Sequence, residues 1–159
     1  MAAKRKSWTQ KWSEAKAKQD LPKVIDCGES GERFLVPGPA EIEEIVSTIP
    51  KGSVIGMDEI ARRLSSRHGV ETCCPMTTGI FAWLMAYAAC ETQGLTVDIR
   101  STDPVDPAKA HHGVPWWRVV KTGGILNPKY PGAPDLQKAL LEMDGMRVEQ
   151  KGMQLVVAR

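Results

Sequence analysis

The chain has 159 residues, of which 42% are hydrophobic and 25% are charged, and its formal net charge is +2. These values exclude wholesale disorder and fibrous repeats, and the length suits one ordinary domain that folds without a metal or disulfides. The longest apolar run, residues 80–90, is far shorter than the roughly 20 residues that a membrane span requires. No apolar segment follows the basic residues near the N-terminus, so we expect a cytoplasmic protein with reduced cysteines. We also expect no membrane association and no cofactor.

The charge is unevenly distributed along the chain. Residues 1–18 hold six basic side chains and one acidic side chain, whereas the remaining residues hold 15 basic and 18 acidic ones. A basic arm on a slightly acidic body permits contacts with phosphate groups, but the charge of the body alone does not predict nucleic-acid binding. We therefore divide the chain into a basic arm and connector, residues 1–36, and one domain, residues 37–159.

The spacing of apolar residues predicts a mainly helical first half. The run Ser7-Trp8-Thr9-Gln10 has the spacing of a helix cap and precedes a short helix over 8–18, whose tryptophans would dock the arm onto the body. The elements expected next are extended segments over 23–25 and 33–36, a helix from Pro39 to the turn at Pro50, a short strand over 53–55, and helices over 57–67 and 75–91. The buried face of the last helix is expected to hold Ile80, Phe81, Leu84, Met85 and Ala88. Two short helices before a longer apolar one are typical of a helix-turn-helix core.

The second half is richer in loops. The expected elements are a long surface loop over 94–115, a buried strand over 117–120, a Gly- and Pro-rich loop over 121–134, a helix over 135–144, and a hairpin made by 148–150 and 154–158. A hairpin that follows a helix-turn-helix core is a wing. The predicted fold class is therefore α+β, a mainly helical winged helix-turn-helix domain with a small C-terminal β-hairpin.

Four motifs along the chain resemble those of a known family. They are IPKGSVIGMDEIARRL at residues 49–64, PWWRVV at 115–120, NPKYPG at 127–132 and LLEMDG at 140–145. In this order and spacing they resemble the C-terminal, DNA-binding domain of the O6-alkylguanine-DNA alkyltransferases, whose counterparts look like VPxGxVxTYGEIA, PCHRVV, GGYxGG and LLxxEG. The resemblance covers roughly residues 42–148 and implies the same winged helix-turn-helix domain.

The residues that carry the family's reaction are replaced. That reaction needs a thiolate to attack the alkyl carbon on guanine O6, a histidine to take the thiol proton through water, and a glutamate to orient the histidine. Trp116 stands at the cysteine position, Trp117 at the histidine position and Asp144 at the glutamate position. Because an indole cannot perform this substitution, we expect no methyl transfer. The resemblance implies instead the alkyltransferase-like branch, whose members have tryptophan for the cysteine, bind alkylated bases and hand them to other repair pathways.

The resemblance also places a base pocket and a set of DNA contacts. The family's ARAVG motif, whose arginine enters the base stack, is replaced by residues 76–80 (MTTGI). The predicted base pocket comprises Trp116, Trp117, Arg118, Tyr130, Met57 and Asp144. The predicted DNA contacts are Thr77, Thr78, Gly79, Lys121 and Lys129. Purely structural roles stay open as well: core filling for Trp116, an ion pair for Arg118 and helix capping for the two threonines. The expected partners are double-stranded DNA, including alkylated DNA, and DNA-repair proteins.

Three other functions stay open. A helix-turn-helix regulator would bind DNA of any kind through Thr77, Thr78, Arg62, Arg63 and the basic arm. A thiol enzyme would use Cys73 and Cys74 ahead of the helix at Pro75, with His68, His111 or His112 as its base. A small-ligand or protein-interaction module would keep the fold alone. A zinc site built from the Cys73-Cys74 and His111-His112 pairs fits poorly, because adjacent ligands lack the usual spacing, so no metal is expected.

Overall fold

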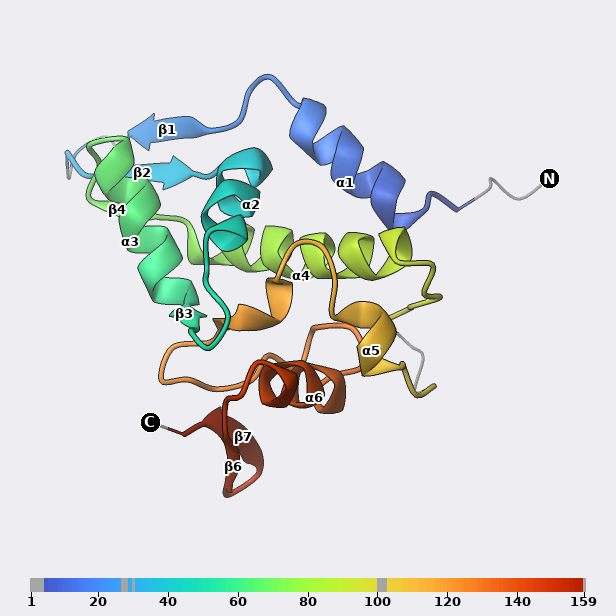
Figure 1. The fold of residues 1–159 in the computed structure, drawn as a ribbon. Helices are drawn as coiled ribbons and strands as arrows, with labels where there is room; N and C mark the ends of the chain where they lie inside the picture. Colours follow the sequence, from blue (N-terminus) through green and yellow to red (C-terminus); the bar gives the residue numbers. More distant parts are fainter. Residues whose placement is uncertain (1–4, 27–28, 30, 100–102, 159) are drawn as a thin grey trace.

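The computed structural model describes residues 5–26, 29, 31–99 and 103–158. Helix α4 (Pro75–Thr92) runs through the middle of the molecule (Figure 1). The helices α1 (Trp8–Ala17) and α2 (Pro39–Ser47) lie on one side of it, and α5 (Pro107–Ala110), α6 (Asp135–Met143) and the C-terminal hairpin lie on the other. The predicted α+β class, mainly helical with a small C-terminal antiparallel hairpin, is confirmed.

The helix at the N-terminus packs on α4. Its first turn is capped by Ser7, whose hydroxyl accepts a hydrogen bond from the Gln10 backbone N–H at 3.1 Å. The Trp12 side chain is buried, and the Trp8 ring lies 4.7 Å from the Tyr87 ring of α4. These contacts dock the arm onto the body as the sequence predicted, because both indoles exchange water for apolar neighbours.

A three-stranded sheet ties the predicted connector to the domain. Its order is β1 (Lys23–Asp26), β2 (Arg33–Val36) and β4 (Thr72–Cys73), with β1 antiparallel and β4 parallel to β2. Leu35 of β2 is fully buried. The segment before residue 37 therefore shares both a sheet and a core with the segment after it.

The next elements place two helices against α4. Strand β3 (Ile55–Gly56) leads directly into α3 (Met57–Arg67), and it pairs in parallel with β5 (Val119–Val120). Ile60 and Leu64 of α3 are fully buried, four residues apart on one helical face. Two shorter helices, α2 and α3, thus precede the longer α4 in the expected order, and strand β4 lies between α3 and α4.

In two predicted segments the type of element differs from the structure. The loop over 94–115 contains α5, whose first turn is capped by the Asp106 carboxylate. Trp117 lies in a 3-10 turn, η2 (Trp116–Arg118), and only the next two residues form a strand. The turn forms because the Arg118 N–H bonds the Pro115 carbonyl at 3.0 Å, while the Trp117 side chain is held by a hydrogen bond described below. A periodic apolar pattern cannot distinguish such a turn from a short strand.

The chain ends in α6 and the hairpin of β6 (Val148–Lys151) and β7 (Gln154–Val157). Gly152 has a φ of +62° at the hairpin turn, a conformation that glycine adopts without strain. Of the helices in the described part of the chain, none combines the length and apolarity of a membrane span.

Candidate functional site

The predicted site residues separate into a buried cluster and an open groove. The centre of the cluster is Asp144, whose side chain is fully buried. Its carboxylate accepts hydrogen bonds from Arg118 Nε at 2.7 Å, Trp117 Nε1 at 2.9 Å and His111 Nε2 at 2.8 Å. Arg118 also donates from Nη1 to the Ile49 carbonyl at 2.8 Å. We call Asp144, His111, Trp117 and Arg118 the Asp144 cluster.

The Asp144 cluster holds a buried negative charge. Burial alone would raise the pKa of Asp144, but the hydrogen bonds from Arg118, Trp117 and His111 more than offset it and lower the pKa to about 2. A carboxylate with so low a pKa is a weak proton acceptor. The cluster is therefore suited to fixing the η2 turn and the loop at His111 rather than to proton transfer.

The sequence did not predict His111 as a partner of Asp144. The family resemblance gives the carboxylate a histidine at position 117, but here that position is a tryptophan and His111, six residues earlier, contacts the carboxylate. The His111 ring also lies 5.0 Å from the Trp117 ring, at 34°. No local pattern could reveal a contact between residues 33 positions apart.

The two tryptophans of the predicted base pocket are buried, as the alternative of core filling for Trp116 has it. Trp116 and Trp117 are 0% and 2% exposed, because η2 packs between α4 and α6 and the Asp144 carboxylate holds the second indole. The Trp116 ring meets the Tyr130 ring edge-on at 5.2 Å. Among the described residues, neither the Trp116 indole N–H nor the Tyr130 hydroxyl has a hydrogen-bond partner. Burial raises the pKa of Tyr130, so this hydroxyl stays protonated.

The predicted phosphate contacts at the start of α4 are partly turned inward. Thr78 is fully buried and its hydroxyl donates to the Cys74 carbonyl at 2.8 Å, so it presents no group to a phosphate. The Thr77 hydroxyl is half-buried and lies 3.3 Å from the Cys74 sulfur. Both hydroxyls are therefore engaged within the first turn of α4, and Gly79 lines a cavity.

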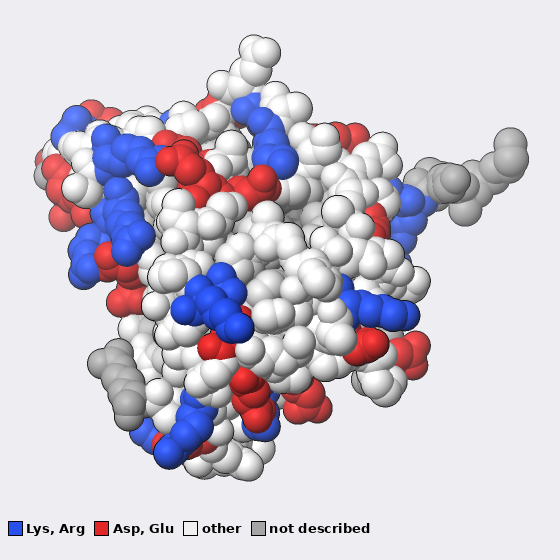
Figure 2. All heavy atoms as spheres, in the orientation of Figure 1, with Lys and Arg blue, Asp and Glu red and all other residues white. Residues whose placement is uncertain are grey.

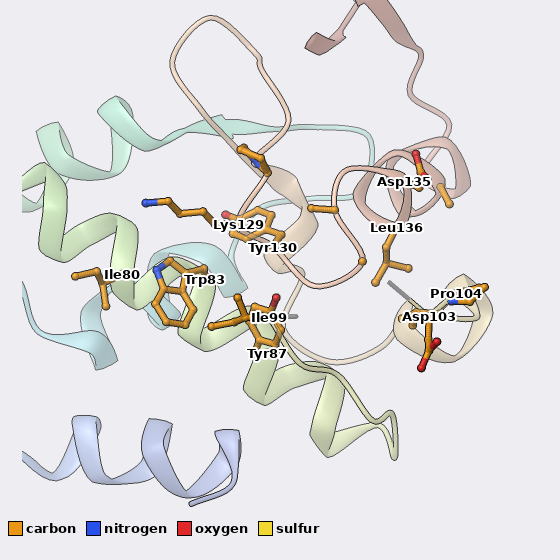
Figure 3. A pocket seen from close by; sticks show the side chains of 15 residues that line it. Ile80, Trp83, Tyr87, Ile99, Asp103, Pro104, Lys129, Tyr130, Asp135 and Leu136 are labelled. Carbon is orange, nitrogen blue, oxygen red and sulfur yellow. The ribbon is translucent and has the colours of Figure 1, made fainter. Parts of the chain in front are cut away.

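A large cavity lies between α4 and the segment that leads into α6 (Figure 3). Its volume is about 900 Å³, and it is bounded by Ile80, Trp83 and Tyr87 on one side and by Lys129, Tyr130 and Leu136 on the other. A second cavity of about 510 Å³ shares Ile80, Trp83, Pro128 and Lys129 with the first and extends to Met57 and Lys121. We call the two together the α4 groove. Five of the predicted site residues line it: Met57, Gly79, Lys121, Lys129 and Tyr130.

The residues of α4 that line the groove were not predicted from the sequence. Ile80 was expected in the core but is 42% exposed, and Met76 is 74% exposed. Met76, Ile80, Trp83 and Tyr87 follow one another at intervals of four, three and four residues, which makes a second apolar stripe beside the buried one. A soluble helix that is apolar on two faces needs a second neighbour, and this signal could have located the groove.

Charged side chains differ between the groove and α3. Lys121 and Lys129 lie on the groove, together with Asp58 of α3, Asp103 and Asp135. On α3, Arg62 and Arg63 both form ion pairs with Glu59. Basic and acidic side chains lie next to one another over the α3 part of the face in Figure 2, so these arginines, the candidates for a regulator, are already partly neutralised.

The cysteines do not line the groove in the described part of the chain. Burial raises the pKa of the Cys73 thiol, whereas hydrogen bonds from Thr77 and Met76 outweigh burial and lower the pKa of Cys74. His68 pairs with Glu41 at 2.9 Å. Within the described residues, the side-chain hydrogen-bond partners of the Cys73 and Cys74 sulfurs are Thr78 and Thr77, not a histidine. No group of three or more metal-binding side chains occurs among the described residues, and Cys27 lies outside them.

Comparisons with known proteins give two structural similarities. No protein-family model matches the chain, and no curated protein matches its sequence. The similar structures are S. pombe Atl1 in complex with damaged DNA containing O6-carboxymethylguanine, at 20% identity, and S. pombe ATL in complex with DNA, at 19% identity. Each similarity covers 76% of this chain and 87% of the other, with a TM-score of 0.47. A similarity of this degree assigns neither a family nor a function.

Proposed function

We propose that this protein binds double-stranded DNA as a winged helix-turn-helix protein, and that it accepts an altered base, turned out of the duplex, in the α4 groove without transferring an alkyl group. The α4 groove carries the proposal. It has the volume of a ligand site, aromatic side chains line it, and two motif positions of the family resemblance, Met57 and Tyr130, lie on it. Passing the bound lesion to repair proteins belongs to the same proposal.

The groove suits a flat, partly polar ligand. Trp83 supplies a half-exposed indole, and stacking on an aromatic side chain contributes about 1–3 kcal/mol per base. The Tyr130 side chain lines the groove, and its hydroxyl is buried without a hydrogen-bond partner among the described residues. Lys121 and Lys129 are exposed on the groove and would contact the phosphates on either side of an extruded base.

The chemistry of the site argues against alkyl transfer there. Trp116 replaces the nucleophile of the resembling family, and the described cysteines lie elsewhere. Asp144 is committed to three side-chain donors and has a pKa of about 2. The Asp144 cluster is connected to the wall of the groove by packing: Trp117 contacts Trp116, and Trp116 contacts Tyr130. The cluster therefore positions the groove and takes no part in bond making.

A titration of matched duplexes tests the proposal. Fluorescence anisotropy of labelled duplexes with one central guanine or O6-methylguanine, at two salt concentrations, should show tighter binding of the lesion. Mass spectrometry of the protein should show no added methyl group. Trp83→Ala should weaken lesion binding about tenfold or more, whereas Met143→Ala, a half-exposed apolar residue outside the groove, should not. Equal affinity for both duplexes with a steep salt dependence would favour the regulator instead.

The second candidate is a module for a small ligand. Its support is the cavity volume of about 900 Å³, which lies within the range of small-molecule sites, roughly 300–1,000 Å³. If neither duplex binds at low salt, the DNA role fails, and thermal-shift screening with small aromatic compounds becomes the test of this alternative.

A further inference from the structure

We infer that the side-chain amide of Asn127 selects the altered base in the α4 groove, because it donates a hydrogen bond to a ring nitrogen that alkylation of the neighbouring oxygen has turned into an acceptor. The inference rests on the proposed function and deepens it, since it names the class of base that the groove takes. That class is the O-alkylated bases, in which the ring nitrogen beside the modified oxygen carries no hydrogen.

Asn127 is the buried polar side chain of the smaller cavity. It is only 6% exposed, and it lines this cavity together with Trp83, so a base stacked on the indole can turn an edge toward it. Among the described residues, the other charged, hydroxyl-bearing or amide-bearing side chains that line this cavity are exposed; they are Asp58, Lys121, Thr122 and Lys129. A hydrogen bond from a buried group is stronger than one from a group in water. Asn127 is therefore the polar group there with the greatest influence on which ligand binds.

Neighbouring groups fix the orientation of the Asn127 amide. Its Oδ1 accepts the backbone N–H of Lys129 at 2.9 Å, so the NH2 end of the amide points the other way. The backbone N–H of Asn127 donates to Gln137 Oε1 at 2.9 Å. Gln137 is itself fully buried, and its Nε2 donates to the carbonyls of Trp117 and Val119 at 3.0 and 2.9 Å. The amide is therefore held in place before a ligand binds.

The NH2 group of Asn127 has a hydrogen to spare. The enclosed side-chain nitrogen and oxygen atoms without a partner among the described residues are Trp116 Nε1 and the Tyr130 hydroxyl. Asn127 Nδ2 also donates no hydrogen bond to a described residue but is not enclosed, so it is open to the cavity that Asn127 lines. Tyr130 lies nearby, and Asn127 opposes the rise in the pKa of its hydroxyl. An amide NH2 carries two hydrogens, so at least one is available to a ligand.

O-alkylation changes what a base presents to such a donor. In guanine and thymine, the ring nitrogen beside the exocyclic oxygen carries a hydrogen, so it is itself a donor. Alkylation of that oxygen removes the hydrogen, and the ring nitrogen becomes an acceptor. An unmodified base therefore sets a donor against the Asn127 amide, whereas an O-alkylated base accepts a hydrogen bond from it. Two facing donors leave a buried group unpaired, which costs more than the lost hydrogen bond alone.

Four bases separate the ring nitrogen from the alkyl group. The full chain is titrated by fluorescence anisotropy with duplexes that carry guanine, O6-methylguanine, 2-aminopurine or 1-methylguanine opposite an abasic site, so that no base pair holds any of them in the stack. 2-Aminopurine has the acceptor nitrogen and no alkyl group. 1-Methylguanine has an alkyl group on that nitrogen, which is then no acceptor. We expect O6-methylguanine and 2-aminopurine to bind about tenfold more tightly than guanine and 1-methylguanine.

Variants of Asn127 assign the effect to its amide. Asn127→Asp replaces the donor by an acceptor of the same shape: one carboxylate oxygen still accepts the Lys129 N–H and the other faces the cavity, so guanine should now bind more tightly than O6-methylguanine. Thr122→Asp adds the same charge at an exposed position on the cavity and is the matched control; it should weaken binding of every duplex but keep the ratio. Asn127→Ser removes the amide without adding charge and should bring the ratio close to one. Thermal unfolding of each variant checks that the fold is intact.

The outcomes distinguish the inference from the proposed function. Tight binding of 2-aminopurine that either Asn127 variant removes supports the inference. It is overturned if 2-aminopurine binds like guanine, if 1-methylguanine binds like O6-methylguanine, or if both Asn127 variants keep the preference. The proposed function then still stands as long as O6-methylguanine binds more tightly than guanine. If all four bases bind alike, the proposed function fails and the inference fails with it.

Discussion

Replacing Asp144 by asparagine should destabilise the protein because it removes a buried charge that three side chains share. The pKa of Asp144 falls from 3.8 to about 2 in the folded state, and each pKa unit corresponds to about 1.4 kcal/mol. The ionised carboxylate therefore contributes about 2 kcal/mol at neutral pH. Asp144→Asn also leaves the Arg118 guanidinium, 13% exposed, without its counter-charge. Breaking such pairs costs about 3–5 kcal/mol when both partners are fully buried, so we expect a loss of about 2–4 kcal/mol here.

The same pKa fixes the pH range of the effect. The folded-state pKa of Asp144 lies below its unfolded-state value, so its contribution is complete above about pH 4 and is lost as the pH falls toward 2. The free energy of unfolding of the unmodified protein should therefore decrease more steeply below pH 4 than that of Asp144→Asn.

Urea unfolding followed by far-UV circular dichroism, at pH 7 and at pH 3, measures both effects. The control is Glu142→Gln on the same region of the chain, since Glu142 is exposed and forms only a surface ion pair with Lys138. This control should change stability by less than about 0.5 kcal/mol. An Asp144→Asn protein as stable as the control, with an unchanged slope below pH 4, would refute our account of the cluster.

Further predictions concern other contacts in the structure. His111→Ala should lower the free energy of unfolding by about 1 kcal/mol, because it removes one hydrogen bond to Asp144; urea unfolding checks this, and no change would contradict it. Iodoacetamide should label Cys74 before Cys73 and Cys90, since Cys74 has a lowered pKa, Cys73 is buried, and burial raises the pKa of Cys90 to about 12; timed peptide mass spectrometry measures the order, and equal rates would be the contrary result. Glu91→Gln should expose α1 to limited proteolysis, because the Glu91 carboxylate accepts the backbone N–H groups of Trp8 and Thr9; a cleavage rate like that of the unmodified protein would show that the cap is dispensable.

The order of helices could be predicted from the sequence because periodic apolar residues specify it locally. α1, α3 and α6 each lie within a residue or so of the predicted range, and Pro39 and Pro75 begin α2 and α4 as expected. The C-terminal hairpin also follows from its alternating pattern and its glycine turn. Short β3 and β5, two residues each, depend on pairing between distant segments, so the sequence located them less well.

The candidate site could be located by motif but not described by it. A motif gives the position of Trp116 in the chain, whereas its exposure depends on α4 and α6 packing around it. The contact of His111 with Asp144 depends on how the loop over 94–115 folds, and that loop has no periodic pattern. The spacing of Ile80, Trp83 and Tyr87 is visible in the sequence. A helix is usually assigned a single buried face, however, whereas α4 has two apolar faces.

The two groups of site residues should separate in experiment. If the Asp144 cluster serves structure alone, substitutions in it will lower stability, and binding will fall only in proportion to the unfolded fraction. If recognition resides in the α4 groove, Trp83→Ala will weaken binding with a smaller cost in stability, because Trp83 is only partly buried. Measuring stability and affinity on the same variants thus tests whether the Asp144 cluster serves the fold while recognition resides in the α4 groove. A cluster variant that folds fully and yet loses lesion preference would place recognition back at Trp116 and Trp117.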